Sequence, residues 1–156
     1  MSMGDEKRQQ LNVTAIRDGT VIDHIRNDAT FKVVEILRLE REGETVLIGV
    51  NLPSGKVGKK GIIKVEKREL TPQEVNTIAL IAPDATVNII KDYRVVAKRR
   101  VELPARLGGV VRCFNPNCVT NNQSVSTMFE VLRSTPPTLR CVYCERVMSG
   151  NDITLK

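Results

Sequence analysis

Four cysteines in two close pairs give the sequence its clearest chemical signal. Four residues separate Cys113 from Cys118, two separate Cys141 from Cys144, and 22 lie between the pairs. One tight turn can present each pair, and four thiolates satisfy the tetrahedral coordination that Zn²⁺ prefers. With four cysteine ligands no coordination position stays open, which favours a structural metal over a catalytic one. The spacing predicts one structural Zn²⁺ per chain.

The redox setting bears on what else the four thiols could do. The charged start of the chain lacks the apolar stretch of a secretory signal, and no run approaches the roughly 18 apolar residues of a membrane span. We therefore expect a cytoplasmic protein without a membrane partner, in which two disulfides are disfavoured. An iron–sulfur cluster could also use four thiolates and stays open as a second interpretation.

The sequence offers few residues for catalysis. His24 is the only histidine. A P-loop needs G-x-x-x-x-G-K-[ST], whereas Gly49 and Gly55 have one residue too many between them and Lys56 is followed by Val57. No G-x-S-x-G motif occurs, and a metal would occupy every thiol nucleophile. We expect a chain that is not an enzyme.

The charge of the chain leaves the class of partner open. A net charge of +6 and a pI near 9.4 suit a nucleotide, a nucleic acid or an acidic protein surface equally. Residues 105–156 carry a net charge of +3, which four thiolates and one Zn²⁺ would reduce to +1. So small a charge is weak for a module that neutralises many phosphates, and only 3% of the residues are aromatic. We expect no nucleic-acid partner, although a zinc ribbon that binds nucleic acid and a small-molecule sensor remain alternatives.

The first part of the chain predicts strands around a capped helix. Two β-prone runs at 11–16 and 20–23 flank residues 17–19, as expected of a strand with a bulge or of a tight turn. Asn27 or Asp28 can cap a helix over 31–39. Strands are then expected at 45–50 and 62–65, with a mobile Gly- and Lys-containing loop between them.

The next part has a stronger helix signal. Thr71, Pro72 and Glu74 form a capping box with proline at the first helical position, so a helix is expected from there to about Ala82. Strands at 85–90 and 93–97 should form a hairpin. The order β-α-β-β-α-β with an extra terminal strand predicts a ferredoxin-like α+β domain with both helices on one face of the sheet.

A charge cluster and a proline at 98–104 mark a domain boundary. We predict a flexible N-terminus over 1–10, a ferredoxin-like domain over 11–103 and a small β-rich zinc domain over 104–156. The β-prone runs of the zinc domain lie at 110–111, 127–132 and 153–155.

Four blocks in this order resemble a known family. They are GTVIDH at 19–24, GVNLPSG at 49–55, APDATVN at 82–88 and the four-cysteine tail, and together they resemble the regulatory chain of aspartate carbamoyltransferase. The resemblance implies an allosteric subunit in de novo pyrimidine biosynthesis that binds CTP and ATP, with UTP as a further effector. It also implies a regulatory dimer whose zinc domains join catalytic trimers, in a dodecamer of six catalytic and six regulatory chains.

The resemblance further implies a nucleotide site on the sheet of the first domain. Phosphate charge would be met by Lys98 and the nearby Lys60. The full set of implied nucleotide-binding residues is Ala15, Ile16, Val21, Asp23, His24, Lys60, Lys64, Asn88, Ile90, Tyr93, Val95 and Lys98. Without the resemblance, the apolar members would be interpreted as core and the lysines as solvated charge.

In the zinc domain, the resemblance implies that residues around the metal contact the catalytic chain. These are Asn115, Asn117, Tyr143, Glu145 and Arg146, which would otherwise be interpreted as turn residues of the two cysteine pairs. The chain departs from the family pattern in having Arg146 for a common lysine, Phe114 for a frequent proline and Gly61 for a frequent aspartate. The last departure bears on the local loop and on dimer contacts.

Overall fold

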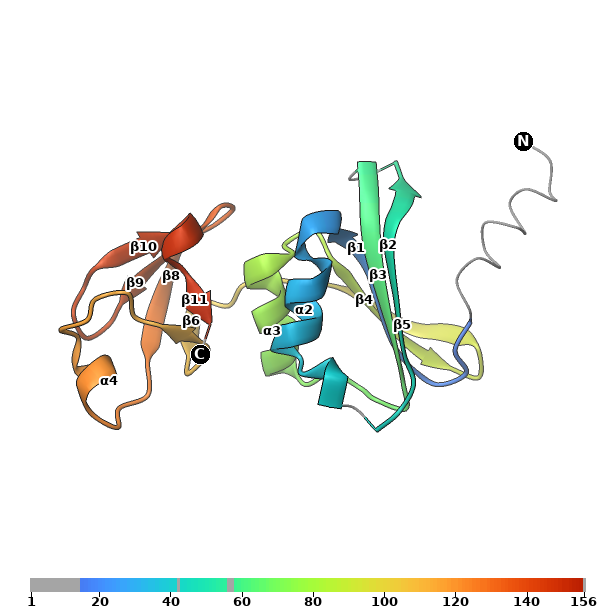
Figure 1. The fold of residues 1–156 in the computed structure, drawn as a ribbon, viewed down its shortest axis with the longest axis horizontal. Helices are drawn as coiled ribbons and strands as arrows, with labels where there is room; N and C mark the ends of the chain where they lie inside the picture. Colours follow the sequence, from blue (N-terminus) through green and yellow to red (C-terminus); the bar gives the residue numbers. More distant parts are fainter. Residues whose placement is uncertain (1–14, 42, 56–57, 156) are drawn as a thin grey trace. The chain divides into compact units, whose positions relative to one another are not determined.

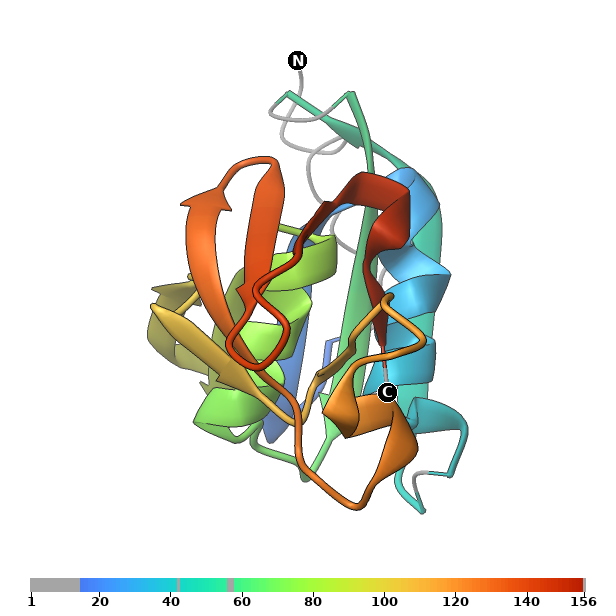
Figure 2. The ribbon, with the colours of Figure 1, turned by 90° about the vertical axis from the view of Figure 1, so that its left-hand side faces the viewer.

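A computed structural model describes residues 15–41, 43–55 and 58–155, and for Asn151 it describes the backbone alone. The chain divides into two compact units between Val101 and Glu102. The N-terminal segment 1–10, expected to be flexible, and residues 11–14 of the first expected strand lie outside the described residues. Figures 1 and 2 show the two units in views that differ by 90°.

The first unit is a five-stranded antiparallel sheet covered on one face by two helices (Figure 1). The strands follow one another across the sheet in the order β2-β3-β1-β4-β5. Their bounds in chain order are β1 Gly19–Arg26, β2 Val46–Ser54, β3 Gly58–Glu66, β4 Thr86–Lys91 and β5 Arg94–Arg100. The helices are α2 Thr30–Ile36 and α3 Pro72–Ile81, so the predicted α+β fold with a ferredoxin-like element order is confirmed.

The core of this unit lies between the sheet and the helices. Alternate residues of each strand point to this side, so that Ile22 of β1 and Ile63 of β3 sit directly opposite each other and are fully buried. Val33 of α2 and Ile78 of α3 are also fully buried. This packing fixes the register of the strands, because a slip by one residue would turn the apolar set outward.

The first helix differs from its prediction. No side chain caps α2, and Asn27 belongs to a short 3-10 helix, η1 Asn27–Ala29, that precedes it. The Asn27 amide instead donates to Asn51 Oδ1 at 2.7 Å, and Asn27 Oδ1 accepts from the Asn51 backbone N–H at 2.6 Å. The predicted cap by Asn27 or Asp28 is therefore wrong, and the Asn27 side chain holds β2 instead. The helix also ends early, at Ile36, and a second 3-10 helix, η2 Leu39–Arg41, follows.

The expectation of a loop between 45–50 and 62–65 is wrong for the described residues 51–54 and 58–61, whereas Gly55 lies in a turn. Both strands continue through this region as a long hairpin. Asn51 takes a left-handed backbone conformation with φ 61°, and the register shifts between Gly49 and Leu52. The bulge lets the strand pass through the Asn-Leu-Pro segment that suggests a loop, and Pro53 is tolerated because β2 lies at the sheet edge. Ala15 and Ile16, the described part of the predicted strand 11–16, lie in no strand.

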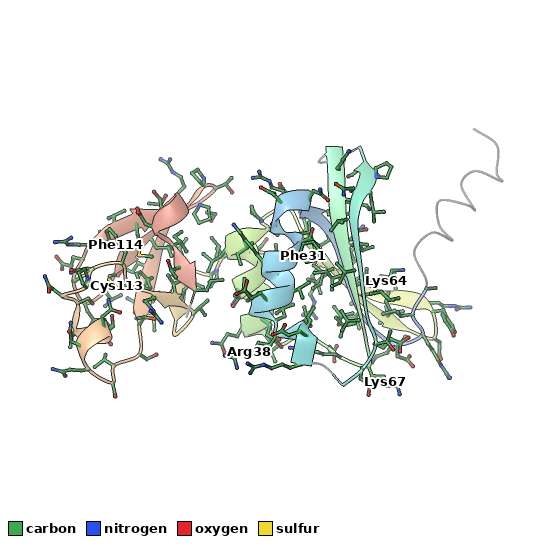
Figure 3. The ribbon with its side chains drawn as sticks, in the orientation of Figure 1. Phe31, Arg38, Lys64, Lys67, Cys113 and Phe114 are labelled. Carbon is green, nitrogen blue, oxygen red and sulfur yellow. The ribbon has the colours of Figure 1, made fainter. Side chains whose placement is uncertain are left out.

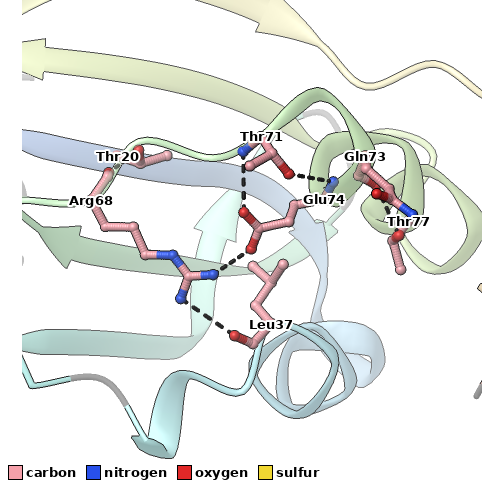
Figure 4. Close-up of polar contacts among 7 residues, drawn as sticks. All are labelled: Thr20, Leu37, Arg68, Thr71, Gln73, Glu74 and Thr77. Carbon is pink, nitrogen blue, oxygen red and sulfur yellow. Dashed lines mark hydrogen bonds and ion pairs between the residues drawn. The ribbon is translucent and has the colours of Figure 1, made fainter.

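The second helix forms as predicted (Figure 4). Thr71 Oγ1 accepts from the Glu74 backbone N–H at 3.2 Å, and Glu74 Oε1 accepts from the Thr71 N–H at 3.1 Å. Arg68 joins this capping box to the end of α2, because its guanidinium donates to Glu74 and to the Leu37 carbonyl. One side chain thus links the start of α3 to the end of α2.

The second unit is built from short strands. Its four-stranded sheet has the order β10-β9-β8-β6, and β7 pairs with β11 separately. Phe129, Leu139 and Met148 form its buried centre. The bounds are β6 Arg106–Gly108, β7 Val111–Arg112, α4 Val119–Asn122, β8 Met128–Ser134, β9 Pro137–Cys141, β10 Val147–Ser149, η3 Gly150–Asp152 and β11 Thr154–Leu155. No helix among the described residues is long and apolar enough to cross a membrane.

Candidate metal centre and ligand-binding face

The first cysteine pair is held by a loop between β7 and α4. Cys113 follows β7 directly, and Cys118 occupies the N-cap position of α4. The Cys118 N–H donates to the Asn115 carbonyl at 3.0 Å, and Asn115 Oδ1 accepts from the Asn117 N–H at 3.1 Å. The Asn121 amide donates to the carbonyls of Cys113 and Asn115 at 2.8 and 2.7 Å. The loop is closed by its own polar groups before any metal is considered.

The second cysteine pair lies on the turn between β9 and β10. Cys141 ends β9, and its N–H donates to the Arg146 carbonyl at 3.0 Å. The Glu145 N–H donates back to the Cys141 carbonyl at 2.9 Å. Glu145 has a left-handed backbone with φ 63°, which lets so short a turn bring Cys144 next to Cys141.

The four sulfur atoms meet in one place. Cys113 Sγ lies 3.6 Å from Cys144 Sγ, Cys118 Sγ lies 3.8 Å from Cys141 Sγ, and all four lie within 4.8 Å of one another. A tetrahedron with Zn–S bonds of about 2.3 Å has sulfur atoms about 3.8 Å apart. A disulfide needs about 2.05 Å, so the cysteines are not paired covalently. The donor set and its spacing fit one tetrahedral zinc ion.

Burial and hydrogen bonding act on these thiols in opposite directions. Burial raises the pKa of Cys113 to about 12 and also raises the pKa of Cys141. Burial also acts to raise the pKa of Cys144, but hydrogen bonds from the Arg146 backbone and the Asn115 side chain lower it to about 7. A bound cation would favour all four thiolates and overcome the cost of burying their charge.

The sheet face away from the helices forms a second candidate site. One row of residues crosses all five strands in direct register, since Lys98 is opposite Asn88, Asn88 opposite Val21, Val21 opposite Lys64 and Lys64 opposite Leu47. Figure 3 shows Lys64 on the side of the sheet away from α2 and α3. The row places two cations and an amide around an apolar centre. Such a surface can accommodate an aromatic base together with an anionic group.

A carboxylate and a lysine pair beside this row. Asp23 Oδ1 lies 2.9 Å from Lys60 Nζ, and both side chains are about four-fifths buried. Burial alone would raise the pKa of Asp23, but the hydrogen bond from Lys60 and that from the His24 backbone hold it below its usual 3.8. Burial lowers the pKa of Lys64, against the attraction of Asp23. The face therefore carries three charged groups that interact with one another.

Each of the two units matches the model of a known protein family. A family described as the allosteric domain of the aspartate carbamoyltransferase regulatory chain matches residues 11–102, and one described as the metal binding domain of that chain matches residues 105–154. The chain belongs to the family of aspartate carbamoyltransferase regulatory chains. Regulatory chains of this name from Pyrococcus abyssi and Porphyromonas gingivalis are 52% and 48% identical to it. The alignments cover 92% and 96% of this chain and 96% and 99% of the relatives.

The family assignment gives the two units their names, an allosteric domain and a metal-binding domain. Among the residues predicted to bind nucleotide in the allosteric domain, Val21, Lys64, Asn88 and Lys98 form the row described above. Asp23 and Lys60 form the ion pair beside it. His24 lies next to Asp23, and its Nδ1 is 3.1 Å from Thr86 Oγ1.

The other predicted nucleotide residues fall into two groups. Ile16 and Ile90 are buried, and with Val21 and Ile62 they form an apolar cluster against Leu47 and Leu52. Because these side chains are buried, they can offer a nucleotide base little exposed surface. Ala15, Tyr93 and Val95 are exposed, and Val95 sits opposite Ile90 in the hairpin of β4 and β5.

The residues predicted to contact a catalytic chain differ in their exposure. Asn117, Tyr143, Glu145 and Arg146 are exposed around the sulfur cluster. Asn115 is only 8% exposed, and its side chain is engaged within the loop. Sequence interpretation missed Thr120 and Asn121, two polar residues just after Cys118 whose side chains hold the metal site. A cluster of short polar residues directly after a ligand is the signal that could have found them.

Proposed function

We propose that this chain is a non-catalytic regulatory subunit that binds CTP and ATP on the outer face of its allosteric sheet, with UTP as a further ligand. The observation that carries the proposal is the row of Lys98, Asn88, Val21 and Lys64 across four neighbouring strands. The two lysines can meet phosphate charge, and the amide can read a polar edge of the base. The ion pair of Asp23 and Lys60 lies where a phosphate would compete for the lysine.

Calorimetric titration of CTP and of ATP into the full chain tests this proposal. Lys98→Ala should weaken both affinities by about tenfold or more, because a hydrogen bond to a charged group contributes about 1.5–3 kcal/mol. Arg99→Ala is a matched control, since Arg99 is the next exposed cation on β5 and lies opposite the core residue Val87. Equal losses in both variants would contradict a site on this face, as would no nucleotide binding by the unaltered chain.

We also propose that two copies of the chain pair through the edge strand β2. That strand contains no charged residue, whereas β5 at the opposite edge carries four basic ones. Charged edge strands resist pairing with other chains, so of the two edges the uncharged one, nine residues long, is the more open to a partner strand. A two-fold axis at β2 would join the two sheets without bringing the basic strands together.

Light scattering on substituted edges tests the dimer. Ile48 on β2 and Val96 on β5 are both about half exposed. Ile48→Lys should give a monomer, because it places like charges beside the two-fold axis, while Val96→Lys should leave the mass unchanged. A dimer that survives Ile48→Lys and dissociates with Val96→Lys would place the interface elsewhere.

The metal-binding domain is the proposed docking module for catalytic chains of aspartate carbamoyltransferase. Asn117, Tyr143, Glu145 and Arg146 surround the sulfur cluster and are exposed for contact. The proposed domain limits are 11–103 and 104–156, and the proposed assembly is a dodecamer of six catalytic and six regulatory chains. Reduced cysteines suit a cytoplasmic setting. Each nucleotide would act on catalysis only through a different affinity for the two states of the assembly.

A further inference from the structure

The hydroxyl of Thr120 points at a sulfur of the metal site. Thr120 Oγ1 donates to Cys118 Sγ at 3.2 Å, and the Thr120 residue is only 7% exposed. The residue lies in the four-residue helix α4, two positions after the ligand itself. A buried hydroxyl is costly unless it has a partner, and a valine of the same shape would fill this space without that cost. The hydroxyl is therefore best explained by its acceptor.

The charge of the site explains why that acceptor matters. Four thiolates around one Zn²⁺ carry a net charge of −2, largely buried within the domain. Nitrogen donors lie at the other three sulfurs: the Asn115 backbone at Cys113, the Tyr143 and Cys144 backbones at Cys141, and the Arg146 backbone with the Asn115 side-chain amide at Cys144. Within the described part of the chain, Cys118 is the sulfur that receives its hydrogen bond from a side-chain hydroxyl.

We propose that Thr120 is a positioning residue for the metal centre, and that its hydrogen bond to Cys118 sets how firmly the domain retains zinc. The hydroxyl withdraws charge from the thiolate and fixes the direction of the Cys118 side chain. Groups that hold metal ligands in this way change metal affinity by about 10- to 100-fold when removed. The inference rests on the four cysteines binding zinc, but not on nucleotide binding or docking.

Three substitutions separate the hydrogen bond from the packing around it. Thr120→Val removes the donor and keeps the shape. Thr120→Ser keeps the donor and removes a methyl group. Asn122→Ala is the control for a looser loop, because the Asn122 amide donates to the carbonyls of Pro116 and Cys118 and not to a sulfur.

The first measurement is zinc release from the full chain into excess chelator, followed with a chromogenic zinc indicator. Thr120→Val should release zinc about 10- to 100-fold faster than the unaltered chain. Thr120→Ser should stay within about threefold, since it retains the donor. A Thr120→Val chain that releases zinc at the unaltered rate would overturn the proposal, and so would a Thr120→Ser chain as fast as Thr120→Val.

A second measurement applies even if a variant is poorly folded without metal. Co²⁺ loaded in place of zinc gives a thiolate-to-metal absorption whose energy depends on hydrogen bonds to sulfur. Thr120→Val should shift this absorption to lower energy, because a thiolate without its donor gives up electron density more readily, while Asn122→Ala should leave it in place. An unshifted Thr120→Val spectrum, or an equal shift in Asn122→Ala, would show that the hydroxyl acts only through packing.

Discussion

Gly61 of β3 packs against the side chain of Thr30 in α2, and this contact predicts the effect of adding one methyl group at position 61. A Cβ at position 61 would lie 1.8 Å from Thr30 Oγ1 and 2.8 Å from both Thr30 Cβ and Cγ2. Thr30 is fully buried at the start of α2, and its hydroxyl bonds the Arg26 carbonyl at 3.4 Å. Neither side can yield without moving the helix away from β3. Gly61→Ala should therefore destabilise the allosteric domain.

The magnitude follows from two opposing terms. Overpacking a rigid core costs about 3 kcal/mol at the upper end of the usual range. Replacing glycine by alanine also restricts the unfolded chain, which returns about 0.4–1 kcal/mol where the native backbone is compatible. The net loss of unfolding free energy should be about 2 kcal/mol. Gly43→Ala is the control, because a Cβ there meets nothing within 4 Å, and it should change stability by less than about 0.5 kcal/mol.

Urea unfolding of the zinc-loaded chain, followed by the far-ultraviolet circular dichroism of α2 and α3, measures this difference. Thr30→Ala should cost stability by itself but should relieve part of the loss in the double variant, so that the two effects are less than additive. The reasoning is refuted if Gly61→Ala is as stable as Gly43→Ala. Full additivity with Thr30→Ala would also refute it, because it would show that the two positions do not clash.

Three further outcomes follow from contacts in the two domains. Glu74→Ala should lower the unfolding free energy by about 2 kcal/mol, because it removes the capping box and one partner of Arg68, whereas Glu74→Gln should cost less in the same urea titration. The folded pKa of Asp23 lies below 3.8, so its stabilisation is present above pH 3.8 and is lost as the pH falls through the folded value. Asp23→Asn should therefore flatten the fall in stability from about pH 5 to pH 3, measured by urea unfolding at a series of pH values; a slope equal to that of the unaltered chain would contradict this. Cys141→Ser should abolish stoichiometric zinc, measured by plasma mass spectrometry of the dialysed chain, and should leave the helical signal of the allosteric domain intact.

The sequence predicted correctly the features that depend on residue type and spacing, namely α3 and the cysteine site. The capping box at Thr71 and Glu74 predicts α3, and it is present in full. The spacing of the cysteines predicts a common site, and their sulfurs lie within 4.8 Å of one another. The two residues of the capping box are three positions apart, and the four cysteines can bind one metal ion only if their sulfurs meet at one place.

The wrong predictions concern features that contacts between distant parts of the chain determine. Asn27 has the composition of a helix cap, but its side chain bonds Asn51, a residue 24 positions away. The segment at 51–54 has the composition of a loop, but pairing with β3 holds it as a strand. Long-range pairing outweighs local preference in both places, and composition alone does not encode it. Likewise, the row of Lys98, Asn88, Val21 and Lys64 depends on strand register, which is set by the buried face of the sheet.

The central claim is that this chain regulates catalytic chains through a zinc-dependent contact. The most direct measurement is the mass, by light scattering with size exclusion, of the zinc-loaded chain mixed with the catalytic trimer of aspartate carbamoyltransferase from the same source. We predict a discrete assembly much heavier than either component, which separates again when zinc is removed with a thiol reagent and chelator. No association with zinc verifiably bound, or an assembly that persists after verified metal removal, would contradict the account.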